Sequence, residues 1–242
     1  MSGLEANPHI SCGCPLSPGD VIPARIRHSA RELLHRHRHD APFAAVVLSG
    51  SYVEAGDTGL HRVGPGDVIV HQPFESHLDR FSARGAEVLT LALTGDLPSG
   101  ALQRADDPDA IARLAERDRA EAAQALMLNS SPVAVTANDW PELLAADLLA
   151  DPGLSIARWA SQRRLHPGSV GRGFRQQFGI TAAGFRAAAR GLRAVHAIRT
   201  SPGTLSEIAA AAGYADQAHM TRATNDITGN PPARLRAICR GR

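Results

Sequence analysis

The chain has 242 residues, of which 43% are hydrophobic and 21% charged, and its formal net charge is +2. This composition is typical of a globular protein with room for one large domain or two small ones. No run of about 18 apolar residues occurs, so the sequence predicts no membrane span. Residues 1–20 lack the basic and apolar segments of a secretory signal, and we expect a cytoplasmic protein.

Cysteine usage agrees with a reducing compartment. Cys12, Cys14 and Cys239 form a small, odd set, which favours free thiols. One residue separates Cys12 from Cys14, whereas zinc-binding cysteine pairs have at least two residues between them. We interpret residues 1–20 as a flexible tail, and a redox or metal role for its two cysteines is a minor alternative.

The basic residues are concentrated toward the C-terminus. Residues 151–242 contain 14 Arg and 4 acidic residues, a net charge of +10, so the rest of the chain carries −8. Every basic residue is Arg, whose planar group suits phosphate and guanine edges, although coding bias is the simpler explanation for the absence of Lys. The asymmetry predicts a polyanionic partner for the C-terminal part, with a solvated basic face as the alternative.

From about residue 22 to 94 the pattern is typical of short β-strands. Apolar runs at 43–48, 68–70 and 88–93 are separated by turn signals. These signals are Ser49-Gly50, Gly56-Asp57, Gly64-Pro65-Gly66-Asp67 and Arg84-Gly85. Strands of this length and spacing predict a small barrel or sandwich.

The middle of the chain predicts a connector and two helices. Residues 95–110 form the connector, and a helical run follows at roughly 109–128, with Ile111, Ala122 and Leu126 near one face. Asn129-Ser130-Ser131-Pro132 ends this run, and another helix is expected from about Asp139 to Ala150. The apolar face of 109–128 is the predicted dimerisation element.

Residues 154–238 predict short helices in two repeated units. Each unit reads as a helix, a short turn and a second helix, which is the helix-turn-helix pattern. The first unit spans 154–177, the second 204–227, and a connecting helix is expected at 182–198. Predicted helix starts are the cap Ser155, the capping box of Thr204 with Glu207, and prolines in a first turn, Pro167, Pro231 and Pro232.

These two units resemble the AraC/XylS DNA-binding domain over about residues 139–238. The residues that carry the resemblance are Phe174-Arg-Gln-Gln-Phe-Gly-Ile180, Glu207-Ile-Ala209, Gly213-Tyr-Ala-Asp-Gln217, His219-Met-Thr-Arg222 and Gly229-Asn-Pro-Pro232 with Arg236. The resemblance implies seven helices in two subdomains joined by the central helix. It also implies that two recognition helices enter successive major-groove segments, about 34 Å apart.

Matched residue by residue, the resemblance implies a set of DNA-contacting side chains. Expected base contacts are Ser169, Gly171 and Arg172 in the first recognition helix and Gln217, Ala218, His219 and Arg222 in the second. Expected phosphate contacts are Arg163, Arg164, Arg175, Ser169 and Thr221. A solvated surface charge is the alternative for any one Arg, whereas Trp159, Phe174, Phe178 and Phe185 are expected in the core.

The chain departs from the family pattern in both units. Thr224 and Thr228 stand where the first unit has Phe174 and Phe178, and the smaller side chains predict a looser second subdomain. Gly171 and Gly173 are expected to weaken the first recognition helix by about 1 kcal/mol each relative to Ala. Sequence reading is therefore expected to depend more on the second unit.

The N-terminal half resembles the cupin β-barrel of the same group of regulators. The residues are His35-Arg-His37-Arg-His39, Leu48-Ser-Gly50, Gly64-Pro-Gly66-Asp67, His71-Gln-Pro73 and His77. Cupin enzymes commonly hold a metal with three His and one Glu. Here His37, His39 and His77 fill the His places, whereas Phe43 and Ala44 stand where the Glu is expected.

Three imidazoles suffice to hold Zn²⁺ or Fe²⁺. Two alternatives remain for this region: a barrel that serves only as a ligand pocket, and a solvated strand edge at 35–39 whose Arg residues prevent pairing. The expected effector site is the barrel interior.

The expected fold class is α+β, with a cupin-like β-barrel followed by an all-α domain with two helix-turn-helix units. The expected domains are a flexible tail at 1–20, a sensor barrel at 21–98, a linker and helical dimerisation region at 99–138, and the DNA-binding domain at 139–242. We expect a ligand-responsive, homodimeric transcription regulator of double-stranded DNA, not an enzyme. The alternatives are a metal-dependent, dioxygenase-like cupin enzyme with a helical appendage, and a regulator that responds to metal or redox state.

Overall fold

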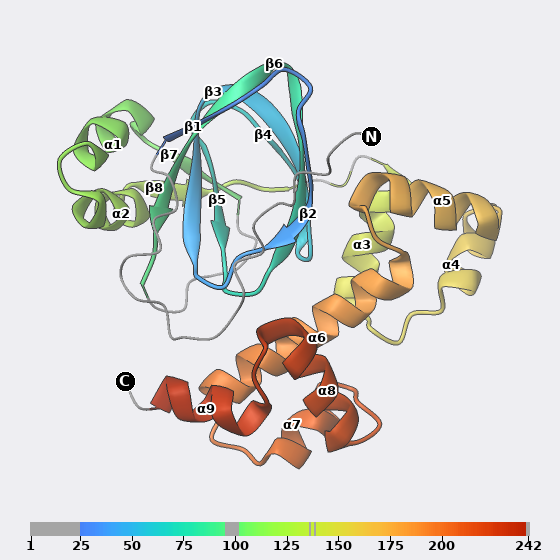
Figure 1. The fold of residues 1–242 in the computed structure, drawn as a ribbon. Coiled ribbons are helices and arrows are strands. Elements are labelled where there is room, and N and C mark those ends of the chain that lie inside the picture. Colours follow the sequence, from blue (N-terminus) through green and yellow to red (C-terminus); the bar gives the residue numbers. More distant parts are fainter. Residues whose placement is uncertain (1–24, 95–101, 136, 138, 241–242) are drawn as a thin grey trace, which may run out of the picture. The chain divides into compact units, whose positions relative to one another are not determined.

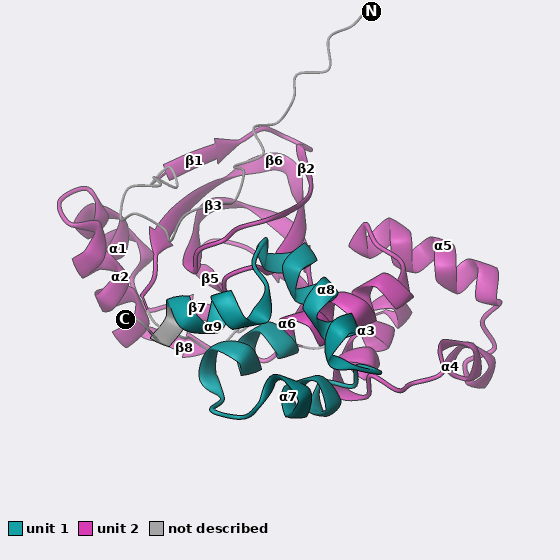
Figure 2. Ribbon diagram, turned by 60° about the horizontal axis from the view of Figure 1, so that its bottom comes forward, with its two compact units in different colours: residues 1–20, 193–242 teal, residues 21–192 magenta. Residues whose placement is uncertain are grey.

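A computed structural model describes residues 25–94, 102–135, 137 and 139–240. Residues 21–192 form one compact unit, and residues 193–242 belong to a second (Figure 2). The predicted tail with Cys12 and Cys14, and the connector residues 95–101, lie outside the described residues.

The first unit begins with an eight-stranded sheet in which every strand pair is antiparallel (Figure 1). The strand order is β1-β6-β3-β5-β7-β8, with β2 on β6 and β4 on β3. Together with the helices that follow, this sheet makes the chain α+β, as predicted. The strands are β1 Arg25–His28, β2 Leu33–Arg38, β3 Phe43–Gly56, β4 Gly59–Val63, β5 Asp67–His71, β6 Ser76–Ala92, β7 Leu102–Ala105 and β8 Ser130–Pro132.

Two of the predicted turns are bends inside long strands. β3 runs through Ser49-Gly50 and β6 runs through Arg84-Gly85, and their pairing shifts register on both sides of Gly50. Gly50 and Gly85 have φ of +73° and +69°, and a Cβ on Gly50 would overlap the carbonyl oxygen of Gly85. Glycine therefore lets the two longest strands bend together where the sequence predicts breaks.

The predicted helical run at 109–128 is two helices, α1 Pro108–Ala115 and α2 Arg119–Leu128. The break occurs because Asp118 caps α2, accepting from the backbone N–H groups of Ala120 and Glu121. Ile111 and Leu126 pack on sheet residues such as Val46. Much of the apolar face that the sequence assigned to a dimer is thus buried within the chain.

The opposite face of the sheet carries a second apolar cluster. Its members alternate along β3 with the residues under α1 and α2, as strand geometry requires, and they are Phe43, Ala45, Val47, Tyr52, Val63, Ile69, Phe81, Ala86, Val88 and Leu102. The same alternation places polar residues of β3 to β6 on this face, next to the apolar cluster. They are Glu54, His61, His71, His77 and Asp79, all buried.

The first helix-turn-helix unit follows the sheet in the same compact unit. Its helices are α3 Trp140–Ala150, α4 Ile156–Gln162, α5 Pro167–Phe178 and the start of α6 Ala182–Thr200. Ser155 caps α4 and Pro167 lies in the first turn of α5, as predicted. Their core joins that of the sheet, because Trp159, Phe174 and Phe178 belong to one cluster with Leu60 and Leu78.

The second helix-turn-helix unit consists of the end of α6 with α7 Leu205–Ala211, α8 Gln217–Thr228 and α9 Pro232–Arg240. The predicted capping box of Thr204 and Glu207 is present at α7. From α3 to α9 the described chain has the seven helices that the family resemblance implies. Thr224 and Thr228 are buried at 1% and 2% exposure, so threonines do occupy the core positions of α8.

None of the helices in the described ranges is both long and apolar enough to span a membrane.

Candidate nucleic-acid interface and a buried histidine cluster

The two predicted recognition helices, α5 and α8, are built alike. Each has 12 residues and ends at a glycine in the left-handed region, Gly179 at φ +68° and Gly229 at φ +66°. Their buried residues stand at the same positions of the two helices, so that Val170 in α5 corresponds to Met220 in α8. The structure therefore contains the same helical arrangement twice, as the sequence predicts.

Arg172 and Arg222 occupy the same position of the two helices, and both are exposed. Within the described part of the chain, neither guanidinium takes part in a hydrogen bond or ion pair. Ser169 and Arg175 are also exposed on α5. The outward face of α5 thus presents the predicted side chains to solvent, with their donors available to a partner.

The predicted side chains of α8 are more constrained. Gln217 is exposed, and its Oε1 accepts a hydrogen bond from Ser206 Oγ at 2.9 Å. The half-buried His219 ring lies edge-on to Tyr214, with 5.0 Å between the ring centroids. Thr221 is half-buried. These contacts hold the side chains of the second recognition helix in place before any partner arrives.

Arg163, a predicted phosphate contact, already has partners within the first unit. Its guanidinium carbon lies 4.1 Å from the ring centroid of Trp159, and its Nη2 lies 3.4 Å from Asp147 Oδ2. The neighbouring Arg164 is exposed and has a φ of +55°. Arg163 therefore stabilises the packing of α3 on α4, whatever contact it also makes to DNA.

The carboxyl end of α5 is held by two arginines of the sheet for which the sequence did not predict this contact. Arg80 on β6 donates to the carbonyl oxygens of Gln176 and Gln177, the latter at 2.7 Å. Arg36 on β2 donates to the carbonyl oxygen of Phe178 at 3.1 Å and pairs with Asp57. Arg36 is therefore half-buried and bonded to the helix, and it is not the solvated edge residue that one alternative proposed. The last carbonyls of a helix lack internal partners and carry negative partial charge, so cations stabilise them.

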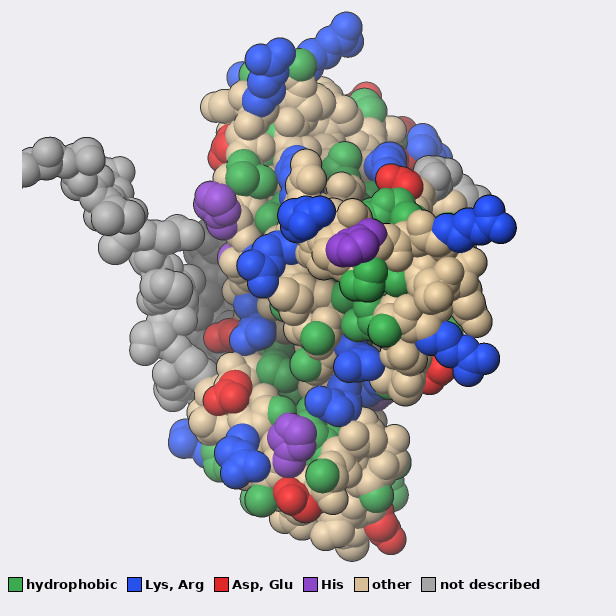
Figure 3. Space-filling model, turned by 90° about the vertical axis from the view of Figure 1, so that its right-hand side faces the viewer, with side chains coloured by type: hydrophobic (Ala, Val, Ile, Leu, Met, Phe, Trp, Pro, Cys, Tyr) green, Lys and Arg blue, Asp and Glu red, His purple; other side chains and the backbone are tan. Residues whose placement is uncertain are grey.

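Arginine side chains are numerous among the side chains visible in Figure 3, and acidic ones are fewer. This agrees with the excess of Arg in residues 151–242. An excess of positive charge favours a polyanionic partner.

The three histidines that the sequence proposed as metal ligands do lie together. One nitrogen atom from each of His37, His39 and His77 lies within 4.8 Å of the other two. His37 pairs with His77 across β2 and β6, and His37 Nδ1 lies 2.9 Å from the carbonyl oxygen of His35. If Nδ1 donates there, Nε2 is left as the ligating atom. The set therefore fits the metal that the cupin resemblance implies.

The sequence missed two further members of this cluster. Glu54 on β3 and His71 at the end of β5 also lie with His77 in a group whose ligand atoms are within 4.8 Å of one another. Glu54 was hidden because its position depends on the pairing of β3 with β6, which is not a local property. Glu54 lies two positions after Tyr52 on β3, so both side chains are on the same face of the strand. This spacing is the signal that could have found Glu54.

The cluster holds its imidazoles neutral. Burial lowers the pKa of His71 to about 3 and of His39 to about 4, with neighbouring histidines adding to both shifts. Burial and the nearby carboxyl of Asp79 raise the pKa of Glu54. Neutral imidazole is the form of His that binds metals.

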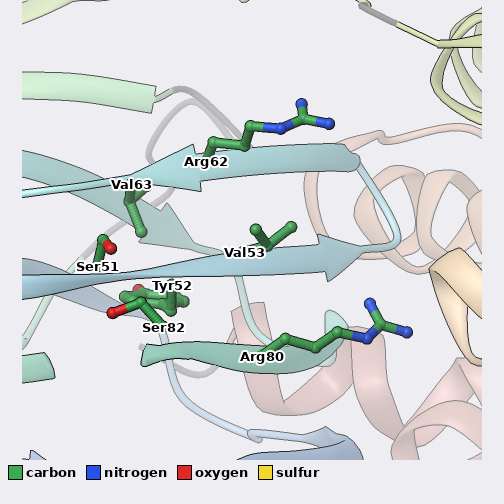
Figure 4. A pocket seen from close by; sticks show the side chains of 7 residues that line it. All are labelled: Ser51, Tyr52, Val53, Arg62, Val63, Arg80 and Ser82. Carbon is green, nitrogen blue, oxygen red and sulfur yellow. The ribbon is translucent and has the colours of Figure 1, made fainter. Parts of the chain in front are cut away.

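A shallow pocket of about 350 Å³ lies over β3, β4 and β6 (Figure 4). Arg62 on β4 and Arg80 on β6 extend in the same direction, with Val53 of the intervening strand β3 between them. Ser51, Tyr52, Val63 and Ser82 complete the lining. This pocket is separate from the barrel-interior site that the sequence proposed.

Comparison with known proteins assigns the helical region. Residues 159–238 match the family of helix-turn-helix domains. No curated protein matches the chain. Fatty-acid-bound ToxT from Vibrio cholerae is 12% identical, with 90% of this chain and 95% of that one covered and a TM-score of 0.43.

Two further solved structures match a smaller share of the chain. The C-terminal domain of AraT, a response regulator from Geobacillus stearothermophilus, is 19% identical, covering 40% of this chain and 84% of that one, with a TM-score of 0.38. A probable AraC family transcriptional regulator from Rhodopseudomonas palustris is 16% identical, covering 40% and 93%, with a TM-score of 0.37. With the family match and the two repeated units together, residues 159–238 are a helix-turn-helix domain.

Proposed function

We propose that this protein is a ligand-responsive transcription regulator that reads promoter DNA with α5 and α8. The observation that carries the proposal is the repeated placement of Arg172 and Arg222, exposed at the same position of two helices with the same length and the same end. A guanidinium at such a position can donate two hydrogen bonds to the O6 and N7 atoms of guanine.

The remaining predicted side chains divide by chemistry. Gln217 suits adenine, since its amide can both donate and accept at N6 and N7, and His219 adds a further donor on the same helix. Ser169, Arg175 and Thr221 lie on the recognition helices as candidate phosphate contacts, which fix register without reading sequence. Arg164 joins them, whereas Arg163 contributes mainly to packing.

The length of α6 supports binding to successive grooves. Its 19 residues span about 28 Å at 1.5 Å per residue. One turn of B-DNA is about 34 Å. A connecting helix of about this length is compatible with two recognition helices that bind neighbouring major-groove segments.

The sheet is the proposed sensor, and its contacts with α5 are the proposed route of response. Arg36 and Arg80 donate to the last carbonyls of α5 from strands β2 and β6. A ligand that shifts either strand changes these contacts, provided that it binds two arrangements of the sheet with different affinity. This makes α5 the recognition helix that senses the state of the sheet.

Zn²⁺ and Fe²⁺ are ions that three imidazoles can hold. In the arrangement that the cupin resemblance implies, His37, His39 and His77 would hold the ion, which would link β2 and β6. Because β2 carries both His37 and Arg36, one of the ligands and one α5 contact lie on the same strand.

The proposed homodimer has a smaller candidate contact surface than the sequence predicted. α1 and α2 bury Ile111 and Leu126 against the sheet, so little of their apolar face remains. Leu128 at the end of α2 is 84% exposed and is the candidate contact. Changing Leu128 to Glu should raise the monomer fraction in light scattering, and an unchanged mass would remove this helix from the interface.

The test of the proposed function is DNA binding. The purified protein is titrated against DNA from upstream of its own gene and against random DNA of equal length, at several salt concentrations. We expect specific binding to be at least about 10³-fold tighter than random binding, and random binding to weaken steeply with salt. Equal affinity for both DNAs would overturn the proposal.

An enzymatic role makes a different prediction. A dioxygenase-like cupin would turn over substrate when loaded with iron and would do so without DNA. Stoichiometric iron with turnover, together with no specific DNA binding, would favour the enzyme over the regulator.

A further inference from the structure

The feature that points beyond the proposed function is a group of buried polar atoms without partners. His77 Nδ1, both ring nitrogens of His61 and Asp79 Oδ1 have no hydrogen-bond partner among the described residues. His77 and Asp79 are 4% and 5% exposed. Buried polar atoms are nearly always satisfied, so a cluster of unsatisfied ones indicates a missing water or ion.

The spacing of the donors favours an ion. Glu54 Oε2 and His71 Nε2 are 3.5 Å apart, and His77 Nε2 lies 3.6 Å from Asp79 Oδ2. These separations are at or beyond the limit of a direct hydrogen bond. Two ligands on one tetrahedral ion with bonds of about 2.0–2.1 Å lie about 3.3 Å apart, which is close to the separation of Glu54 from His71.

Two donor sets share His77, and charge distinguishes them. The set of His37, His39 and His77 is neutral and includes two half-buried rings. The other set replaces them with Glu54 and His71, which are 3% and 4% exposed. A divalent ion in a dry site requires compensating negative charge, and Glu54 supplies it when the ion displaces its proton, with the carboxyl group of Asp79 beside His77.

We propose that Glu54, His71 and His77 form a buried site for a divalent transition ion, with Zn²⁺ as the reference ligand. Two imidazoles and one carboxylate are a donor set that such ions prefer over Mg²⁺ or Ca²⁺, which favour oxygen ligands. The site joins β3, β5 and β6, and it differs from the three-histidine set that the cupin resemblance implies. His37 and His39 lie beside it as neighbours.

Metal binding by matched variants tests the proposal. The full chain, freed of metal, is titrated with Zn²⁺ against a chromophoric chelator, and bound zinc is counted by mass spectrometry. We expect one ion per chain in the wild type. Glu54→Gln and His71→Phe should weaken binding more than about 100-fold, beyond the 10–100-fold typical of an outer-shell change.

Two controls separate this site from others. Glu75→Gln changes a buried carboxyl just before β6 that belongs to neither donor set and should weaken binding far less than Glu54→Gln does. Cys12→Ser with Cys14→Ser should also leave it unchanged. No zinc binding by the wild type, wild-type affinity in Glu54→Gln and His71→Phe, or loss of binding in the cysteine variant would overturn the proposal.

Zinc-edge anomalous diffraction from the loaded wild type keeps the test decisive if the buried variants do not fold. A peak bonded to Glu54, His71 and His77 supports the proposal, and a peak bonded only to His37, His39 and His77 overturns it. Neither outcome depends on DNA binding, so the site stands or falls separately from the proposed regulator.

Discussion

The two helix-turn-helix units share a backbone plan but differ in what holds them together. In the first, Phe174, Phe178 and Phe185 pack with centroid distances of 4.5, 5.3 and 5.6 Å, and all three are fully buried. In the second, Thr224 and Thr228 occupy the places of Phe174 and Phe178. Residues 193–242 contain no Phe or Trp.

The difference extends to the partners of each recognition helix. The end of α5 is held by Arg36 and Arg80 of the sheet. The second unit relies on internal polar contacts, since Thr228 Oγ1 donates to the carbonyl oxygen of Thr224 at 2.9 Å and also accepts from Asn230 N at 3.1 Å. The two units thus have the same backbone arrangement but different surroundings. The end of α5 contacts the sheet, whereas α8 is held by polar contacts within its own unit.

The largest expected effect concerns the two cores. Phe178→Ala should lower the free energy of unfolding by about 3–5 kcal/mol, because it leaves a cavity in an aromatic cluster. The matched change Thr228→Ala should cost only about 1–2 kcal/mol, since it removes one methyl group and the hydroxyl hydrogen bonds. Urea denaturation of both variants measures this, and equal losses would show that the two cores are equivalent.

The next effect concerns the support of α5 by the sheet. Arg80→Ala removes two hydrogen bonds from a charged donor to the end of α5, and such a bond is worth about 1.5–3 kcal/mol. Hydrogen exchange should therefore speed up in the last turn of α5 and stay unchanged in α8. Unchanged exchange in α5 would contradict the proposed coupling.

The two glycines of α5 should respond with opposite sign. A Cβ on Gly173 would lie 2.5 Å from Trp140 Cζ2, whereas a Cβ on Gly171 has no neighbour within 4 Å. Gly173→Ala should destabilise by about 1–3 kcal/mol through overpacking, and Gly171→Ala should stabilise by about 1 kcal/mol. Thermal unfolding of the two variants checks this. Destabilisation by both changes would show that position 171 does not accept a methyl group.

The smallest effect concerns the core of α8. Thr224 Oγ1 is buried without a hydrogen-bond partner in the described residues. Thr224→Val keeps the shape and removes the unsatisfied hydroxyl, so it should raise the free energy of unfolding by about 1 kcal/mol. A loss of stability would mean that this hydroxyl has a partner such as a buried water.

Local features of the helical part could be predicted from the sequence. Ser155, Pro167 and the pair Thr204 and Glu207 act where the sequence placed them, because caps depend on residues three or four positions apart. The break before Asp118 was missed. Periodicity alone continued the helix there, whereas the carboxylate of Asp118 starts a new one.

Features that depend on strand pairing could not be predicted in the same way. Gly50 and Gly85 are typical of turns in the sequence, but in the structure they are bends inside β3 and β6. Their role depends on the close approach of the two strand backbones at these positions. His37, His39 and His77 were found from spacing, whereas Glu54 and His71 join them only through the register of β3, β5 and β6. The contacts of Arg36 and Arg80 with α5 could not be predicted for the same reason, since their partners lie about 100 residues or more away.

We propose that both recognition helices read DNA, with α8 contributing more. Binding of Arg172→Ala, Arg222→Ala and the double variant to the same upstream promoter DNA tests this, with Arg84→Ala, an exposed sheet arginine, as control. We expect Arg222→Ala to lose about 1–3 kcal/mol of binding free energy, Arg172→Ala to lose less, and the double variant to lose the sum. Wild-type affinity in both single variants would show that neither arginine reads DNA.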